Sequence, residues 1–192
     1  VRQRRRRAEV RVIDTIREHL SRGEGRANHF YLCSNGFVTI GIGCMIPDVD
    51  SALTLPLVMK SNWALARPEQ VESDYVRVSQ QEPNRVAPYY QRFCSTELPE
   101  AAIDELLDDK IEEFSRQLVK AFPDFYQFPE PAQLGLLDMA FNLGTRALLG
   151  WTNFCRGVRT RDWQLCADEC HRRPPVSEER NRETRELFEA AR

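Results

Sequence analysis

The sequence predicts an α+β fold, because the spacing of its apolar residues changes along the chain. Residues 9–21 carry apolar side chains at helical spacings of three and four. Residues 29–42 are instead rich in aromatic and β-branched residues and contain Asn35-Gly36, a strong hairpin signal. From residue 96 onward the pattern is helical again. We therefore expect one helix, a small early β-sheet and then several helices.

The composition suits one domain with a substantial core, since the chain has 192 residues and a hydrophobic fraction of 42%. Residues 1–26 hold nine Arg and four acids, whereas residues 97–113 hold eight acids and one Lys. A frayed basic arm and a solvated helix face explain this asymmetry, with an anionic partner as the alternative. The run from Arg4 to Arg7 lacks interleaved aromatic residues, so binding of nucleic acid is not expected.

The first helix should end at Gly23 and Gly25, which bracket Glu24. Strands are expected near 29–33 and 37–42. Residues 45–95 carry five prolines and predict an irregular segment with only short helices, such as one after Pro68, and with a loop at Asp48 and Asp50.

The remaining residues predict a helical region. Thr96 is expected to cap a long helix that runs to about Phe122, with a buried stripe of Ile103, Leu107, Ile111, Phe114 and Leu118. Residues 131–143 are apolar nearly all round, which indicates a buried helix ending at Gly144. Short helices near 153–160 and 162–170 and a last helix capped by Ser177 should follow. The expected organisation is one domain made of a basic arm (1–8), a helix and hairpin (9–44), an inter-lobe segment (45–95) and a helical lobe (96–192).

Six cysteines in 192 residues favour disulfides and an oxidising compartment, with reduced core cysteines as the alternative. The pairs considered are Cys33 with Cys44, and Cys155 with Cys166 or Cys170. Zinc-site spacing is absent from the sequence, and we expect neither a metal nor a cofactor. No stretch of 18 apolar residues predicts a membrane span, and no signal peptide is recognisable.

Glu24 is the leading candidate for chemistry. A helix C-terminus carries partial negative charge, which disfavours an ionised carboxylate, and burial would act in the same direction. A carboxylic acid kept protonated near neutral pH is what a glycosidase needs to protonate its leaving-group oxygen.

The residues around Glu24 resemble the phage-type lysozymes, the bacteriophage muramidase family. The resemblance is carried by Glu24-Gly25, Tyr31 and the run Asn35-Gly36-Phe37-Val38-Thr39-Ile40-Gly41-Ile42-Gly43. It resumes in Leu137-Asp138-Met139-Ala140-Phe141-Asn142-Leu143-Gly144, Gly150-Trp151-Thr152-Asn153-Phe154, Asp162-Trp163 and Arg180-Asn181-Arg182. Roughly two thirds of the chain is covered, and residues 45–95 look like an enlarged segment between lobes. The resemblance implies a lysozyme-like fold with a small β-hairpin lobe and a mainly helical lobe joined by a long helix.

The family uses a triad of Glu, Asp and Thr. The resemblance implies Glu24 as the general acid and Thr39 as the residue that positions the attacking water. The Asp position falls on Cys33, and residues 25–47 contain no Asp or Glu that could replace it. Three roles stay open for Cys33: a free thiol that acts in catalysis, a half of a disulfide, or a structural residue. Tyr31 and Asn142 are the expected substrate-binding residues.

The resemblance thus implies a peptidoglycan muramidase that cleaves the β-1,4 bond between N-acetylmuramic acid and N-acetylglucosamine. The alternative is a glycan-binding module that has lost catalysis, because the family Asp is replaced by Cys33. The expected partners are the glycan strand and an immunity or inhibitor protein, and a monomer is expected. We expect the domain to act in the bacterial periplasm as part of a longer antibacterial effector.

Overall fold

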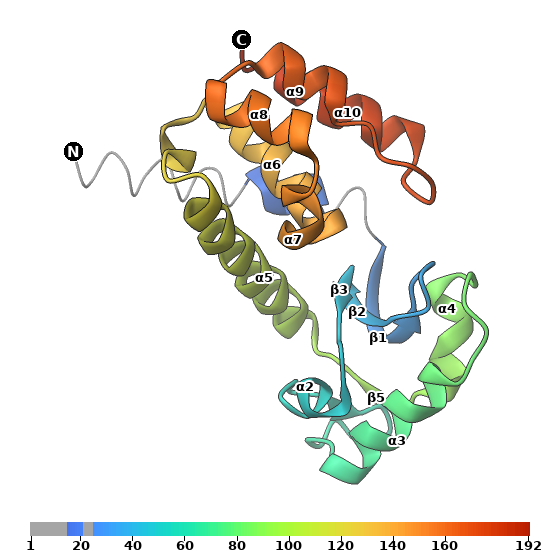
Figure 1. Ribbon diagram of the computed structural model, residues 1–192. Helices are drawn as coiled ribbons and strands as arrows, with labels where there is room; N and C mark the ends of the chain where they lie inside the picture. Colours follow the sequence, from blue (N-terminus) through green and yellow to red (C-terminus); the bar gives the residue numbers. More distant parts are fainter. Residues whose placement is uncertain (1–14, 21–24) are drawn as a thin grey trace. The chain divides into compact units, whose positions relative to one another are not determined.

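The computed structural model describes residues 15–20 and 25–192, which form two compact units (Figure 1). Unit 1 contains residues 15–20 and 109–192, and unit 2 contains residues 25–108. Helix α5 (Glu100–Ala121) contributes residues to both units. Helices together with small antiparallel sheets make the chain α+β, as the sequence predicts. The basic arm and Glu24 lie outside the described residues.

The main sheet of unit 2 is antiparallel and has the order β1-β2-β3. Its strands are β1 (Arg26–Leu32), β2 (Val38–Ile42) and β3 (Cys44–Met45). The expected hairpin is therefore present. In its turn the Gly36 amide donates to the Cys33 carbonyl, and the Cys33 amide donates to the Phe37 carbonyl. Gly36 has φ +78°, so this is a three-residue loop in which glycine supplies the left-handed position.

The pairing of strand β1 with β2 is interrupted in the middle of β1 by a bulge. The register runs Ala27↔Gly41 and then Tyr31↔Thr39, so three residues of β1 stand opposite one of β2. The bulged residues bond elsewhere: the Asn28 carbonyl accepts from the Leu98 amide, and the Phe30 carbonyl accepts from the Cys94 thiol. The bulge thus fastens the hairpin to the segment that leads into α5.

Residues 45–95 are more regular than the sequence predicts. They form α2 (Val49–Leu53), β4 (Val58–Met59), the twelve-residue α3 (Pro68–Ser79), α4 (Ala87–Tyr90) and η1 (Gln91–Phe93). The loop expected at Asp48 is wrong, because its carboxylate accepts from the Ser51 amide and caps α2.

Thr96 does not cap the long helix. It lies in β5 (Thr96–Glu97), which pairs with β4 in a second sheet that the sequence did not predict. Its hydroxyl and amide both donate to Asp74, a fully buried residue of α3. Since Pro99 then comes immediately before Glu100, the helix begins three residues later than expected.

Unit 1 is helical throughout its described part. Residues 15–20 are helical, and their Ile16 and Leu20 are buried. After α5 and the short η2 (Phe125–Gln127) come α6 (Glu130–Leu143), α7 (Thr145–Leu149), α8 (Thr152–Thr160), α9 (Trp163–Glu169) and α10 (Glu178–Glu189).

The expected helices of this unit are confirmed within a few residues. Helix α6 is buried along most of its length, ends at Gly144 with φ +77°, and packs against α10. Ser177 caps α10 by accepting from the Arg180 amide. The predicted stripe of α5 is buried except at Phe114, which is half-buried and meets the Phe141 ring edge-on.

No described helix is long and apolar enough to cross a membrane.

All six cysteines are free thiols in the structure, so the expected disulfides are not formed. Cys33 stands opposite Phe37 beyond the end of β1, whereas Cys44 lies on β3 opposite Ile40. Strand β2 separates them, which places the two chains about 10 Å apart, too far for a disulfide.

The three cysteines considered for the second disulfide, Cys155, Cys166 and Cys170, point to separate backbone carbonyls. The Cys155 sulfur lies 3.5 Å from the Leu148 oxygen, the Cys166 sulfur 3.8 Å from the Phe154 oxygen, and the Cys170 sulfur 3.3 Å from the Ala167 oxygen. Each thiol therefore has a weak acceptor of its own in place of a sulfur partner.

Candidate functional site

The hairpin of unit 2 brings three predicted site residues onto one face of the sheet. Tyr31 and Thr39 are direct cross-strand partners, so their side chains leave the same face. Cys33 follows Tyr31 by two residues, and side chains alternate along a strand, so the thiol continues this row. Leu32, Val38 and Ile40 occupy the opposite, buried face. We call the row of Tyr31, Cys33 and Thr39 the hairpin face.

The hairpin face is open at its edges and closed at its centre. Tyr31 and Cys33 are half-buried, and Phe37 and Met45 are 54% and 47% exposed. Thr39 between them is only 2% exposed, and its hydroxyl donates to the Phe37 carbonyl at 3.0 Å. A hydroxyl has one donor and two acceptor lone pairs, so Thr39 keeps the capacity to accept from a further group.

Cys33 is the most accessible of the six thiols, because the other five are buried. It lies near Tyr90, whose pKa is raised chiefly by burial and further by the neighbouring Cys33. The Tyr90 hydroxyl itself is engaged, because it donates to the Glu82 carbonyl at 2.7 Å.

His29 of β1 is only 6% exposed. Its Nε2 lies 2.8 Å from the Ala87 carbonyl oxygen, because the bulge in β1 turns the ring toward α4. Burial lowers the pKa of His29. The ring is thus a structural group of the β1–α4 junction.

The start of β1 is held by an ion-pair clamp. The Arg26 guanidinium donates to the Glu100 carboxylate at 2.6 Å and to the Asp104 carboxylate at 2.9 Å. A third donor reaches the Glu100 carbonyl oxygen at 3.1 Å. These contacts fix the backbone two residues after Glu24 against the first turn of α5.

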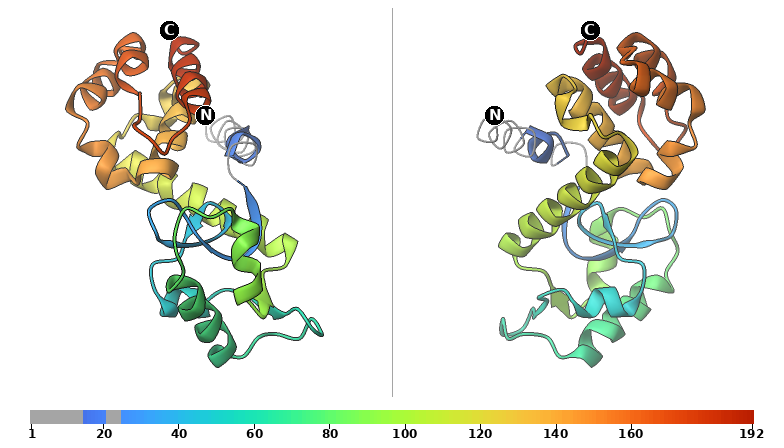
Figure 2. Two further views of the ribbon diagram at one scale, coloured as in Figure 1. Left: turned by 90° about the vertical axis from the view of Figure 1, so that its right-hand side faces the viewer. Right: turned by 60° about the vertical axis from the view of Figure 1, so that its left-hand side comes forward.

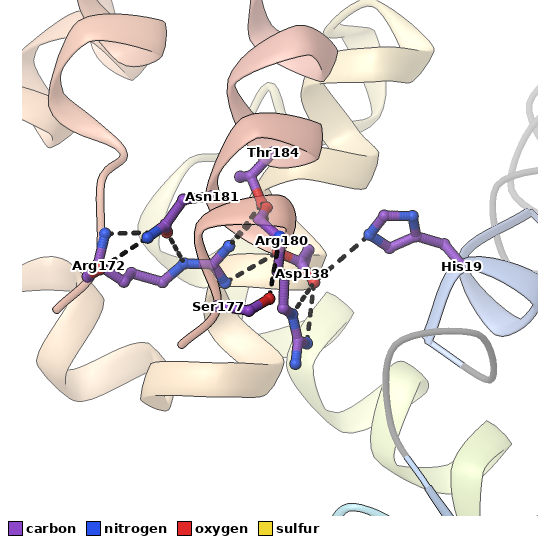
Figure 3. A network of polar contacts seen from close by, with 7 residues as sticks. All are labelled: His19, Asp138, Arg172, Ser177, Arg180, Asn181 and Thr184. Carbon is purple, nitrogen blue, oxygen red and sulfur yellow. Dashed lines mark hydrogen bonds and ion pairs between the residues drawn. The ribbon is translucent and has the colours of Figure 1, made fainter. Parts of the chain in front are cut away.

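The polar centre of unit 1 is Asp138 on α6, which is fully buried (Figure 3). Its Oδ1 accepts from the Arg180 Nε at 3.0 Å and lies 2.9 Å from a second nitrogen of the same guanidinium, and its Oδ2 accepts from the Thr184 hydroxyl at 2.8 Å. Arg172 places a guanidinium nitrogen 2.8 Å from Oδ2. His19, from the helical residues 15–20, lies 3.6 Å from Oδ1.

This network holds four segments together around one carboxylate. Burial by itself raises the pKa of Asp138, but His19, Arg180, Arg172 and Thr184 outweigh it and keep that pKa well below its usual range. Asn181 completes the network, because its amide group donates to the Arg172 carbonyl and accepts from the Arg172 amide (Figure 3).

Sequence reasoning missed Asp138 as well as Arg172. The available signal was a single acid within residues 131–143, which are otherwise apolar nearly all round, since a buried carboxylate requires a partner of opposite charge. Arg182, which the resemblance also includes, lies on the exposed face of α10 near Glu179 and Glu186.

The other predicted residues have mixed outcomes. Asn142 is half-exposed near the end of α6 in unit 1, and Glu24 lies outside the described residues. The structure thus assembles the three residues of the hairpin face, whereas Asn142 belongs to the other unit and Glu24 lies outside the described residues. Of the two tryptophans in the resembling segments, Trp163 is buried and Trp151 is half-buried. Within residues 15–20 and 25–192, no group of three or more His, Cys, Asp or Glu is arranged to hold a metal ion.

Comparison with known proteins adds no assignment, since no family model and no curated protein sequence matches the chain.

Proposed function

We propose that the chain is a peptidoglycan muramidase that cleaves the β-1,4 glycosidic bond between N-acetylmuramic acid and N-acetylglucosamine. Glu24 is the general acid and Thr39 orients the attacking water. The observation that carries the proposal is the hairpin register, in which Tyr31 and Thr39 face each other and Cys33 continues the row. The sequence motif requires these positions to lie on one side of a hairpin that starts just after the acid.

The local chemistry of Thr39 supports its role. Because its proton is committed to the Phe37 carbonyl, the hydroxyl oxygen presents acceptor lone pairs to a second group. A water that donates one hydrogen to this oxygen keeps a lone pair free to attack the anomeric carbon. This is the positioning role that an inverting glycosidase assigns to a group opposite its acid.

Cys33 occupies the position at which a carboxylate would act as the base. It is a free, half-exposed thiol, so a disulfide does not prevent its participation. A thiolate there can accept the proton of the attacking water. Tyr31 borders the same face and supplies a flat surface for a sugar ring.

A second function, glycan binding without hydrolysis, is favoured by two specific observations. No carboxylate occurs between residues 25 and 47, and the Thr39 side chain is almost completely buried. A fold that kept a glycan-binding face but lost its base would show both features.

Lysis of purified peptidoglycan by the intact protein tests the choice. A muramidase releases reducing ends, and Glu24→Gln lowers the rate by about 1,000-fold or more because the leaving group is no longer protonated. Thr39→Val, which keeps the side-chain shape, should lower the rate by about 100-fold. Equal rates for the wild type and Glu24→Gln would refute the enzyme assignment.

Cys33→Asp distinguishes the two functions further. If Cys33 stands at the base position, an aspartate there raises the hydrolysis rate, whereas Cys33→Ser lowers it. A wild type that binds peptidoglycan without cleaving it, together with an active Cys33→Asp variant, would establish the binding module. Mass spectrometry of the released fragments identifies the bond that is cut.

A further inference from the structure

A short hairpin in unit 2 carries two exposed apolar side chains at its end. Its arms are β4 and residues 64–66, joined by the bridge Val58↔Leu65 and by the bond from the Met59 amide to the Ala64 carbonyl. Trp63 and Leu65 are 66% and 72% exposed. The hairpin, which we call the Trp63 hairpin, projects as a narrow loop in Figure 2.

The Trp63 hairpin is held in one conformation from both sides. At its base the Lys60 amide donates to the Ser95 carbonyl, and the Lys60 ammonium donates to the carbonyl of Cys94 at 2.8 Å. At its tip the Trp63 amide donates to the Met59 carbonyl, and the Asn62 side chain accepts from the Ala64 amide. The indole is therefore presented by an ordered backbone, which reduces the entropy lost when a ligand binds.

Trp63 adopts a backbone conformation that is unfavourable for a tryptophan residue. Its φ is +58°, in the left-handed region that suits glycine or asparagine and that a bulky side chain adopts at a steric cost. Its indole makes no ring or cation contact with another described side chain that would compensate for this cost. Such a position indicates that the exposed indole serves a purpose other than stability.

The exposed area and the charge of the Trp63 hairpin indicate which kind of ligand it can bind. Trp63 and Leu65 together expose on the order of 300 Å², well below the roughly 800 Å² that each partner contributes to a stable protein interface. Residues 61–66 carry no charged side chain, so the tip itself offers a ligand no ionic contact. Exposed Ser61 and Asn62 add hydrogen-bonding groups beside the indole. A neutral ring with an apolar face and polar edges matches this combination.

We propose that the Trp63 hairpin is a carbohydrate-binding subsite at which the indole stacks on an N-acetylhexosamine ring of a glycan strand. The ring's axial C–H groups contact the indole face, and its hydroxyl or acetamido groups bond to the polar side chains at the tip. The choice of an N-acetylated sugar rests on the proposed function. The inference that a stacking surface exists depends only on the exposed, ordered indole of Trp63.

Titration of the intact protein with a soluble N-acetylglucosamine hexamer tests the subsite, with calorimetry as the readout. Trp63→Ala should weaken binding by about tenfold, since the contacts of one aromatic ring contribute roughly 0.5–1.5 kcal/mol beyond area burial and about 1.4 kcal/mol corresponds to a factor of ten. Trp63→Phe, which keeps a flat ring, should weaken it by no more than about threefold. Val86→Ala, a change at a 75% exposed apolar residue elsewhere in unit 2, is the matched control and should have no effect.

The outcomes separate this subsite from the catalytic proposal. Wild-type hydrolysis with equal hexamer affinity for wild type and Trp63→Ala would overturn the subsite and leave the muramidase standing. Tenfold weaker hexamer binding by Trp63→Ala in a protein that never hydrolyses peptidoglycan would support the subsite and remove the muramidase. Sedimentation that shows a wild-type dimer dissociated by Trp63→Ala, with hexamer affinity unchanged, would assign the surface to a second copy and overturn the proposal.

Discussion

Asp138 illustrates how one buried charge organises a group of helices. Its carboxylate forms ion pairs with two arginines and accepts a hydrogen bond from a threonine, and Arg172 is only 1% exposed. Removing one partner of a buried ion pair leaves the other charge without compensation in a poorly solvated place, which costs far more than losing a surface pair. Loss of Asp138 is therefore expected to be costly because it leaves the charges of Arg172 and Arg180 without their carboxylate partner.

Asp138→Asn should lower the free energy of unfolding by about 3–5 kcal/mol, because Arg172 and Arg180 would keep their charges without the carboxylate. Urea denaturation followed by circular dichroism measures the change. Asp168→Asn removes the half-exposed partner of Arg185 and is the control, with an expected change within about 0.5 kcal/mol. Equal losses for the two variants would show that the network contributes no more than a surface pair.

The low pKa of Asp138 also predicts how stability responds to acid. Its pKa in the folded protein lies below the value of about 3.9 in the unfolded chain. A depressed carboxylate pKa stabilises the fold at pH values above the unfolded value, and this contribution is lost as pH falls toward the folded value. The stability difference between wild type and Asp138→Asn should therefore shrink as pH is lowered from about 5 to 3. A difference that stays constant over this range would contradict the assignment.

At the scale of elements, the contact between α6 and α10 depends on a glycine. A Cβ added at Gly135 would lie 2.7 Å from the Phe188 ring, which is fully buried. The ring and the helix backbone can therefore approach more closely than any other residue at 135 would permit.

Gly135→Ala should destabilise the protein by about 1–3 kcal/mol, because the added methyl group forces the two helices apart or the ring out of its rotamer. The melting temperature in differential scanning calorimetry reports the loss. Combining Gly135→Ala with Phe188→Leu should cost less than the sum of the two single changes, since the smaller side chain vacates the space that the methyl group needs. Additive losses would mean that the ring and the methyl group do not compete.

The sequence predicted elements well where local signals coincide. Asn35-Gly36 predicted the hairpin, and Ser177 and Gly144 predicted helix ends, because turns and caps are determined by residues within a few positions of each other. The β4–β5 sheet was missed because its strands are two residues long and 37 positions apart. Pairing of that kind depends on tertiary packing, which a local sequence pattern does not predict.

The candidate site was predictable to a similar degree. The expected hairpin brings Tyr31 and Thr39 opposite each other, since hairpin register follows from the turn. It could not predict that Thr39 is buried or that His29 turns inward, because both depend on the bulge and on α4, which the chain reaches much later. Trp63 gave no signal, since exposure and a positive φ arise from the hairpin around it.

At the scale of the whole molecule, the thiols differ sharply in accessibility. Burial raises the pKa of Cys94 and Cys166 to about 12 and that of Cys170 to about 11, and it also raises the pKa of Cys155. Cys44 is buried as well, which leaves Cys33 as the single half-exposed sulfur.

The native protein should therefore react with one equivalent of a thiol reagent such as dithionitrobenzoate at neutral pH, and with six equivalents after denaturation. Cys33→Ser should abolish the rapid equivalent, and peptide mass spectrometry should locate the label. Fewer than six thiols in denatured, unreduced protein would show that disulfides form in solution.

The division of the chain into two units has a consequence for synthesis on the ribosome. Residues 15–20 belong to unit 1, yet the rest of that unit begins at residue 109. Residues 25–108 are synthesised in between as one uninterrupted stretch. Unit 2 can therefore complete its contacts before the residues that bury Ile16 and Leu20 have been synthesised. The nascent polypeptide thus carries an early apolar segment without its final environment until the C-terminal helices are translated, which makes this interval the period when a chaperone would be most useful.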